Sequence, residues 1–144
     1  MRRKTVRQVM RMSTIKAQPP EATVRDASRL MAAHNIGSVL VIDGDRLVGI
    51  FTERDALRRV LGRDLDPDQT ALADVMTRDP DTIGPDDSVC DAIRRMDEFG
   101  YRHLPVVERG RIVGVISTRD CPFDDLAAMA DELEDRHAIA ERAW

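Results

Sequence analysis

Apolar side chains in the second half of the chain recur at two different spacings, and each spacing predicts a different kind of element. Between Asp87 and Gly100 they recur every three or four residues, which is the spacing of one face of a helix. Asp87 or Ser88 can start this helix, and Gly100 can end it. The apolar face comprises Val89, Ala92, Ile93, Met96 and Phe99.

Two stretches after this helix are rich in β-branched residues, LPVVE at 104–108 and RIVGVIS at 111–117. Arg109 and Gly110 lie between them, and such a two-residue connection is typical of a β-hairpin. Before the helix, residues 82–85 have the pattern of a short extended piece that ends in a turn. This half of the chain therefore predicts a strand, a helix and two paired strands.

The first half of the chain repeats this pattern. Residues 23–55 align with residues 88–120 without a gap, and 11 of the 33 aligned positions are identical. The alignment gives the first half a helix over 23–34 and two strands with the sequences SVLVID and RLVGIF. A second helix with the sequence ALRRVLG is expected to end near Gly62. Such self-similarity indicates an internal duplication.

Short openings precede both repeats. QVM at 8–10 and DVM at 74–76 each come before a proline-containing extended stretch, and they are offset by 66 residues rather than the 65 of the repeats. From these features we expect four segments. They are a first repeat at 1–62, a linker at 63–73, a second repeat at 74–122 and a C-terminal helix at 123–144.

The repeated unit predicts the fold class. We expect an α/β (α+β) protein made of two β-α-β-β-α repeats, each with one small sheet and helices on one face. A sheet of this size does not bury its surface well alone, so we expect the two sheets to pack together with pseudo-twofold symmetry. The C-terminal helix is added to this arrangement.

Composition and charge argue against several classes of protein. A net charge of −4 and 3% aromatic residues argue against a nucleic-acid-binding protein, which needs a basic face or stacking side chains. We interpret the basic N-terminus as a solvated arm that comprises Arg2, Arg3, Lys4, Arg7 and Arg11. No apolar run reaches membrane-spanning length, so no membrane contact is expected. Cys90 and Cys121 have neither metal-ligand nor disulfide spacing, which fits a cytoplasmic protein without a metal site.

One short motif occurs in both repeats, GIFTERD at 49–55 and GVISTRD at 114–120. Its hydroxyl residue and its aspartate are three positions apart, which is the pattern of a capping box at a helix start. In the second copy, however, Pro122 should break the helix almost at once, so that it restarts near Asp124. A helix cap alone therefore leaves the second copy unexplained.

A second interpretation is that the motif binds a ligand. Its glycine lets a ligand or a neighbouring strand approach the backbone, and its aspartate can accept two hydrogen bonds from the vicinal hydroxyls of a ribose. Thr52 and Asp55 would supply these groups in the first copy, and Ser117 and Asp120 in the second. We call the strand end that carries the hydroxyl residue and the aspartate a corner. The same spacing therefore suits a helix cap and a ligand-binding corner.

These features together resemble a known family. Over residues of about 6–122 the chain is similar to a tandem pair of cystathionine-β-synthase-type (CBS) domains, also called a Bateman module. The similarity lies in the VM openings, the extended stretches, the strand pairs and the repeated glycine, hydroxyl and aspartate. It implies clefts between the repeats that bind adenosine-containing ligands such as AMP, ADP, ATP or S-adenosylmethionine.

The resemblance assigns roles to residues of this chain. The family's ribose-binding acids fall on the two motif aspartates, and its hydroxyl positions fall on Thr52 and Ser117. Adenine would contact the extended segments before the helices, mainly through backbone groups and apolar walls. The expected nucleotide-contacting residues are Ala17, Gln18, Thr52, Arg54, Asp55, Thr82, Ile83, Arg102, His103, Ser117, Thr118, Arg119 and Asp120.

The phosphate-binding end differs between the repeats. The family's basic residues before the second strand correspond to Arg102 in the second repeat but to Gly37 in the first. Glu53 takes the place of Thr118, and its charge would repel a phosphate that faced it. The two clefts are therefore expected to be chemically unequal, and the better pairing of Arg102 is with Asp55 of the other repeat.

Residues 123–144 predict a strongly helical, acidic tail with one apolar seam. This seam can pack on its own module or on a second subunit, and the flat dimers common in the family make a homodimer the expected assembly. The seam comprises Phe123, Leu126, Ala130, Leu133, His137, Ala140 and Trp144.

Taken together, we expect a stand-alone regulatory module without a cofactor, which binds an adenine nucleotide and signals by changing shape. Its target would be an unidentified partner protein or its own dimer. The alternatives are a structural dimerisation module with vestigial clefts and a sensor of S-adenosylmethionine or NAD(H). An enzyme is not expected, because the sequence has no Cys-His or Ser-His-Asp arrangement, no P-loop and no metal cluster.

Overall fold

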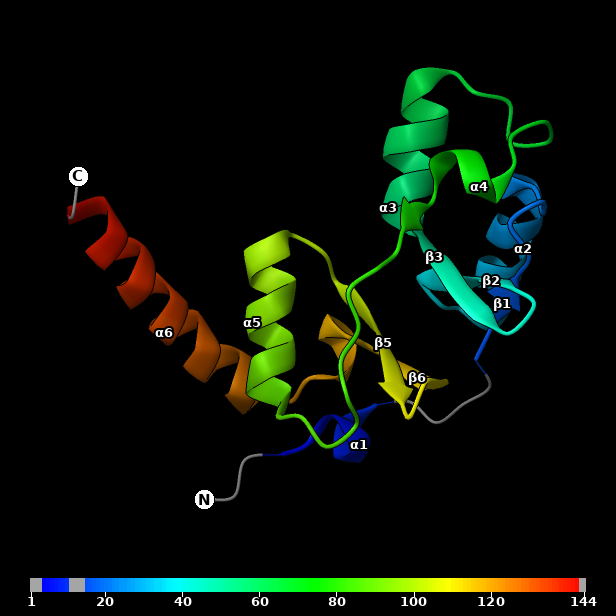
Figure 1. Cartoon of the computed structure of the whole chain (residues 1–144). Coiled ribbons are helices and arrows are strands. Elements are labelled where there is room, and N and C mark those ends of the chain that lie inside the picture. The colour runs from blue at the N-terminus through cyan, green and yellow to red at the C-terminus, as the bar shows by residue number, and fades with distance from the viewer. Residues whose placement is uncertain (1–3, 11–14, 143–144) are drawn as a thin grey trace. The chain divides into compact units, whose positions relative to one another are not determined.

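The computed structural model describes residues 4–10 and 15–142 of the chain (Figure 1). The chain divides into two compact units. The first unit is Thr14–Asp81, and the second unit combines Met1–Ser13 with Thr82–Trp144. Mixed helix and sheet in both units confirms the α+β class.

A four-stranded sheet organises the first unit. Its strands lie in the order β1 (Ala17–Gln18), β2 (Ser38–Asp43), β3 (Arg46–Thr52) and β4 (Thr77–Arg78). β1 pairs with β2 in parallel, and the other neighbours are antiparallel. Helix α2 (Val24–His34) connects β1 to β2, as the alignment of the two repeats predicted.

A helical stretch follows β3 directly. It begins with α3 (Glu53–Asp55) and continues as a π-helical turn, η1 (Ala56–Val60), and a 3-10 turn, η2 (Leu61–Arg63). The expected helix is therefore present but is not α-helical throughout. A loop then leads to the short helix α4 (Leu72–Val75) and to β4.

The second unit is built on a hairpin of β5 (His103–Glu108) and β6 (Arg111–Ser117). Helix α5 (Val89–Phe99) precedes the hairpin and ends at Gly100, which has a left-handed backbone as predicted for a helix stop. The 3-10 turn η3 (Thr118–Asp120) follows the hairpin.

The two hairpins have the same register, which confirms the duplication. Ser38 pairs with Thr52 in the first unit, and His103 pairs with Ser117 at the matching place in the second. Each hairpin also has an irregularity at the same position, between Val41 and Ile42 in the first unit. An extra residue at matching places in two copies is the mark of one inherited backbone plan.

The parallel pairing before the helix is shorter in the second unit. In the first unit Leu40 N–H donates to the Lys16 carbonyl at 3.0 Å, which extends β1. The position that matches Leu40 is Pro105, which has no N–H to donate. The pairing there is reduced to a bridge between Ile83 and Val106.

Each of the two openings packs on the unit that contains the other repeat's hairpin. Helix α4, in the DVM opening, packs on the first unit, where Leu72 N–H donates to the Ala22 carbonyl at 2.8 Å. Helix α1 (Val6–Val9), in the QVM opening, packs on the second unit, where Val6 N–H donates to the Asp87 carbonyl at 2.9 Å. Leu72 and Val6 are both fully buried. The basic segment expected to be a solvated arm is therefore packed over Val6–Val9, where Arg7 forms ion pairs with Asp86 and Glu108.

This arrangement differs from the expected division into repeats at 1–62 and 74–122. The opening of each repeat completes the other unit, because its apolar side chains enter that unit's core. Residues 72–78 accordingly belong to the first unit, with α4 in its core and β4 in its sheet.

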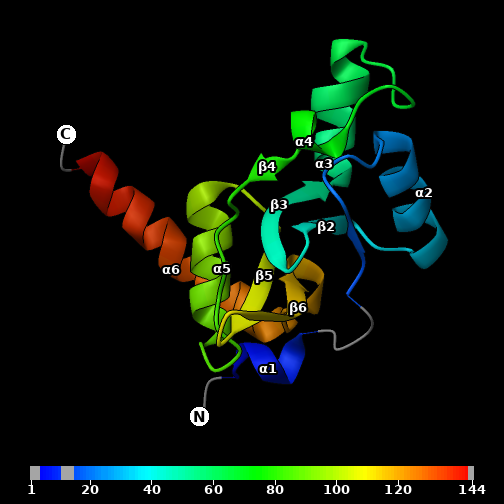
Figure 2. The same cartoon turned by 45° about the vertical axis from the view of Figure 1, so that its right-hand side comes forward.

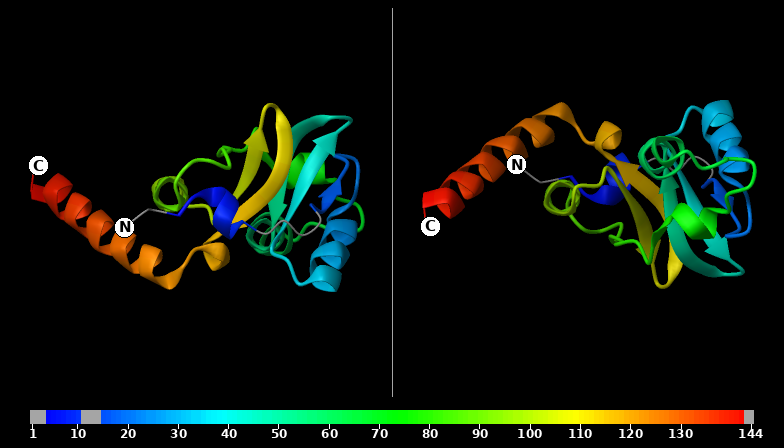
Figure 3. Two further views of the ribbon diagram at one scale, coloured as in Figure 1. Left: turned by 90° about the horizontal axis from the view of Figure 1, so that it is seen from below. Right: turned by 90° about the horizontal axis from the view of Figure 1, so that it is seen from above.

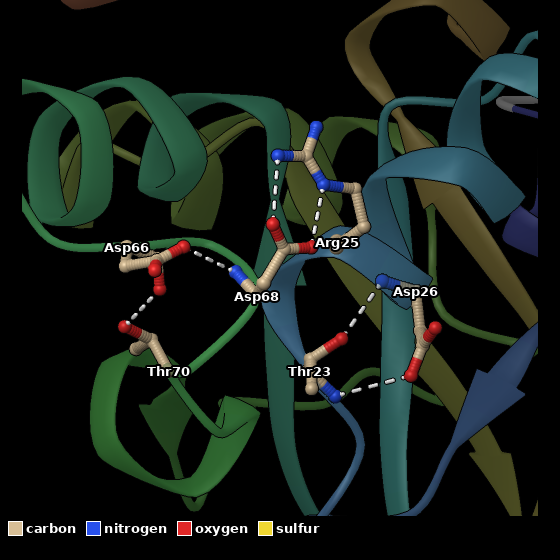
Figure 4. A network of polar contacts seen from close by, with 6 residues as sticks. All are labelled: Thr23, Arg25, Asp26, Asp66, Asp68 and Thr70. Atoms are coloured by element: carbon tan, nitrogen blue, oxygen red, sulfur yellow. Dashed lines mark hydrogen bonds and ion pairs between the residues drawn. The ribbon is translucent and has the colours of Figure 1, made fainter.

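The segment 63–73, expected to be a linker, is fixed to the start of α2 (Figure 4). The Arg25 guanidinium donates to both carboxylate oxygens of Asp68, at 2.9 and 3.3 Å. Asp66 accepts hydrogen bonds from Asp68 N–H at 2.9 Å and from the Thr70 hydroxyl at 2.7 Å. The segment is therefore an ordered part of the first unit.

Helix α6 (Phe123–Arg142) packs on its own unit through its first turns. Leu126 contacts the core, and Met129 is 2% exposed, whereas Ala130 is exposed. Leu126 and the half-buried Leu133 are as expected for the seam, whereas Met129, not Ala130, is the buried residue between them. Arg94 of α5 forms an ion pair with Glu132 at 3.6 Å.

The later turns of α6 extend away from α5 (Figures 2 and 3). Four members of the expected seam lie outside the residues whose side chains are described. They are Phe123, His137, Ala140 and Trp144.

Candidate functional site

The first corner of the repeated motif lies where β3 ends and α3 begins. Thr52 N–H donates to Asp55 Oδ2 at 3.0 Å, and Asp55 N–H donates to Thr52 Oγ1 at 3.2 Å. These two bonds form the capping box that the spacing predicted. The Asp55 side chain is 13% exposed, so the box fixes a carboxylate that still reaches the surface.

The second corner forms the same box without a lasting helix. Ser117 N–H donates to Asp120 Oδ2 at 2.9 Å, and the Ser117 hydroxyl lies 3.2 Å from the same oxygen. The helical turn ends at Asp120, and Cys121 is extended. Helix α6 restarts at Phe123, so the break predicted from Pro122 is confirmed. The capping box is thus present in the second copy although only a single 3-10 turn follows it.

The glycine of the first motif admits a neighbouring strand. A Cβ atom on Gly49 would lie 2.4 Å from Met76 Sδ and 3.0 Å from the Thr77 carbonyl oxygen. Of the two reasons proposed for this glycine, a ligand or a strand, the described contacts are those of the strand. Gly49 is paired with Arg78 of β4 in the sheet.

The segments expected to contact adenine are held by their own units. Ala17 and Gln18 form β1. Ile83 is buried, its N–H donates to the Pro105 carbonyl at 3.0 Å, and its carbonyl accepts from Val107 N–H at 2.9 Å. Both polar backbone groups of Ile83 are therefore used in the sheet.

The Thr82 carbonyl accepts a hydrogen bond from Arg95 Nη1 of α5, at 2.6 Å. Sequence reasoning missed Arg95, because the matching position in the first repeat is the apolar residue Leu30. A base in the second repeat at a position where the first repeat has an apolar residue was the signal that could have identified Arg95.

The expected phosphate-binding residues gather at one end of the second hairpin. The Arg102 carbonyl accepts from Thr118 N–H at 3.1 Å, and His103 pairs in register with Ser117. Arg102 and Arg119 are exposed, whereas His103 is half-buried. The structure therefore brings these residues together beside Asp120, in the same unit.

The first unit has the same backbone contact with different side chains. Glu53 N–H donates to the Gly37 carbonyl at 3.1 Å, as Thr118 N–H does to Arg102. Glu53 is exposed, and Arg54 is half-buried beside it. The chemical inequality of the two corners that the sequence predicted is therefore present in the folded units.

Asp55 has an ionic partner that sequence reasoning missed. Arg59 Nε lies 3.6 Å from Asp55 Oδ1, and Arg59 Nη1 donates to the carbonyls of Val75 and Met76 at 3.2 and 3.1 Å. An acid followed by a base four residues later is a recognisable helical pair and could have been found. The position that matches Arg59 in the second repeat is Asp124, which carries the opposite charge.

Cys121 follows the second corner directly. Its Sγ lies 3.5 Å from the Ser117 carbonyl oxygen. Burial raises the pKa of this thiol to about 11, and the neighbouring Asp120 carboxylate adds to the shift. The thiol is therefore protonated at neutral pH.

Within residues 4–10 and 15–142, no cluster of three or more His, Cys, Asp or Glu side chains has the arrangement of a metal site. In that same part of the chain, no helix combines the length and the apolar character needed to span a bilayer.

Comparison with known families identifies the fold. The model of the CBS domain matches residues 19–62 and 72–121, which cover both repeats. The chain therefore belongs to the CBS domain family and contains a tandem pair of these domains. The recognition made from the repeated motif is confirmed.

Individual relatives agree with this assignment. A CBS domain-containing protein of Arabidopsis thaliana, CBSCBSPB3, is 36% identical in an alignment of 142 positions that covers 94% of this chain and 26% of the relative. The chain thus spans about a quarter of the length of that curated relative. A solved candidate signal-transduction protein with CBS domains from Burkholderia ambifaria is 35% identical with a TM-score of 0.78, covering 81% of this chain and 90% of that one.

A third similarity concerns the fold alone. The CBS domain pair of protein MJ0100 is 24% identical, has a TM-score of 0.73, and covers 83% of this chain and 93% of that one. Its solved structure is a complex with 5′-methylthioadenosine and S-adenosyl-L-methionine.

Proposed function

We propose that this CBS pair is a regulatory module that binds adenosine-containing nucleotides of the AMP, ADP and ATP class and signals by changing conformation. The observation that carries the proposal is the duplicated corner. In each copy the backbone N–H of the hydroxyl residue at the strand end holds the aspartate carboxylate, at 3.0 Å in the first and 2.9 Å in the second. A carboxylate held in this way is ready to accept hydrogen bonds from the two hydroxyls of a ribose without first losing rotamer freedom.

The remaining roles follow from the chemistry of the neighbouring residues. Arg102 and Arg119 are exposed cations that could contact phosphate oxygens. His103 and Thr118 would add hydrogen bonds at the same end of the second hairpin. Of the extended segments at 17–18 and 82–83, Ala17, Gln18 and Thr82 would face the adenine, because Ile83 is buried.

The test is titration calorimetry with AMP, ATP, NADH and S-adenosylmethionine. We expect heat of binding from at least one adenine nucleotide, and a loss of affinity of roughly tenfold or more in Asp55→Asn or Asp120→Asn, because each removes a charge-assisted hydrogen bond. Asparagine keeps an oxygen that can accept the capping bond, so it perturbs the fold less than alanine. Asp45→Asn, in an exposed hairpin turn, is the control.

The titration also separates the alternatives among ligands. Tighter binding of S-adenosylmethionine or NADH than of either nucleotide would make the module a sensor of that compound. Binding that is unaffected by both aspartate variants would overturn the assignment of the ribose corners.

A second candidate function is a structural dimerisation module without a working ligand site. The observation in its favour is apolar surface on the helical stretch after the first corner, where Leu57 and Leu61 are 62% and 61% exposed. Light scattering tests it together with the calorimetry. A dimer that gives no heat with any of the four probes would support this function and exclude the sensor.

A further inference from the structure

We propose that Arg59 is a positioning residue that connects Asp55 to α4 and β4, the last elements of the first unit. The ligand-dependent part of this inference rests on the proposed function, whereas its structural part does not. Arg59 is not among the residues that the family resemblance assigned to ligand binding.

The contacts of Arg59 lie on both sides of its guanidinium. Nε faces Asp55 Oδ1 at 3.6 Å, and Nη1 donates to two carbonyls, Val75 at 3.2 Å and Met76 at 3.1 Å. A guanidinium is a planar fork with five N–H donors, so one side chain can hold both groups at fixed angles. A lysine ammonium would contact one group well but not both.

The two carbonyls lie where such a donor is needed. Val75 is the last residue of α4, and Met76 is its C-cap with an extended backbone. The last carbonyls of a helix have no partner within the helix and must find one elsewhere. Arg59 supplies this partner, and it thereby fixes the point at which the chain leaves α4 and enters β4.

The π-helical turn η1 carries Arg59 into this place. Val60 is fully buried in the core of the first unit, whereas Arg59 next to it is 40% exposed and reaches α4. π-helical turns are rare and are frequent at functional sites. In the second unit Pro122 prevents the corresponding turn, and the matching residue is Asp124.

This arrangement links ligand binding to the chain segment that leads out of the first unit. A ribose that donates to Asp55 competes for the carboxylate that also attracts Arg59, and so changes the geometry of the guanidinium. The Val75 and Met76 carbonyls depend on the same guanidinium. Occupancy of the first corner is therefore transmitted to residues 75–79, which precede the second unit.

Hydrogen exchange with mass spectrometry tests the structural part without any ligand. Two backbone amides within residues 74–79 can report on this segment. Met76 N–H donates to the Leu72 carbonyl at 2.8 Å, and Asp79 N–H donates to the Val48 carbonyl at 3.1 Å. We expect Arg59→Gln to speed exchange over residues 74–79 by at least about fivefold, because the carbonyls lose their donor. Arg58→Gln removes the same charge from an exposed neighbouring position and should leave this exchange unchanged.

Two further variants separate positioning from general destabilisation. Arg59→Lys keeps the charge and should recover only part of the protection. In an Asp55→Asn background, Arg59→Gln should have a smaller effect than in the wild type, because residues that act through one another are not additive. Equal exchange in wild type and Arg59→Gln, or equal acceleration by Arg58→Gln, would overturn the proposal.

The ligand arm uses AMP as the probe. In the wild type AMP should change exchange over 74–79, and in Arg59→Gln that change should disappear while affinity falls about fivefold or more. If the wild type gives no heat with AMP, ATP, NADH or S-adenosylmethionine, the proposed function fails. The ligand-free exchange then still decides whether Arg59 holds the segment.

Discussion

At the scale of single residues, the repeated motif forms a helix cap with a geometry that also suits the binding role proposed for it. Asp55 and Asp120 each cap their own helical turn, and each presents a carboxylate beside a fixed hydroxyl. A cap needs only one oxygen of the carboxylate. The spacing that predicts a capping box therefore does not exclude a binding corner, and both interpretations of the motif are compatible with the structure.

The glycine of the motif leads to the first residue-scale prediction. We expect Gly49→Ala to lower the free energy of unfolding by about 1–3 kcal/mol, because its Cβ would lie 2.4 Å from Met76 Sδ and 3.0 Å from the Thr77 carbonyl. Urea unfolding followed by circular dichroism measures this. In a Met76→Ala background the cost should fall, since the side-chain part of the clash is removed. An unchanged unfolding midpoint in Gly49→Ala would contradict the close approach of β4.

At the scale of elements, local patterns predicted most of the structure. The apolar spacing placed α5, the β-branched runs placed both hairpins, and the proline placed the break before α6. The conformation of these elements is determined by residues that are close to one another in the sequence. The π-helical turn η1 was not predicted, because its register depends on burying Val60 and on the contacts of Arg59 with α4.

The ion pair between α2 and the following loop leads to a prediction about pH. The hydrogen bond from Arg25 holds the pKa of Asp68 below its ordinary value of 3.8, and it raises the pKa of Arg25. A lowered carboxyl pKa means that the pair stabilises the unit above pH 3.8 and that this contribution is lost as pH falls through the lowered pKa. Both groups are exposed, so we expect a small effect that salt weakens.

Urea unfolding of the wild type and Asp68→Asn at pH 7 and pH 3 measures this contribution. The difference between the two proteins should be larger at pH 7. In an Arg25→Gln background, Asp68→Asn should make a much smaller difference at pH 7, because the hydrogen-bonded partner is absent and only the weaker attraction of Arg29 remains. A difference that grows at pH 3 would mean that the pair does not act through its charges.

At the scale of the whole chain, the exchange of the openings was not predictable from sequence. QVM and DVM are similar, and each is followed by its own repeat, so proximity in sequence favours the wrong unit. Their true partners are fixed by Val6 and Leu72, which fill the cores of the other units. The offset of 66 residues was a signal that the openings follow a register of their own, but it did not name a partner.

The C-terminal helix leads to a prediction about the whole chain. The sequence left open whether this tail packs within its own module or between subunits, and Met129 at 2% exposure favours the first for the early turns. A chain that stops after Phe123 loses Leu126, Met129 and Glu132 from the second unit. We expect it to be destabilised by at least about 2–5 kcal/mol, which is the usual cost of removing one buried methionine side chain.

A chain that stops after Asp135 keeps these three contacts and is the matched control. We expect it to unfold at the same urea concentration as the wild type and to have the same number of subunits by light scattering. A fall from two subunits to one, with stability unchanged, would show instead that the later turns of α6 join two subunits. The two truncations thus divide α6 into a part that completes the core of its own unit and a part whose role depends on assembly.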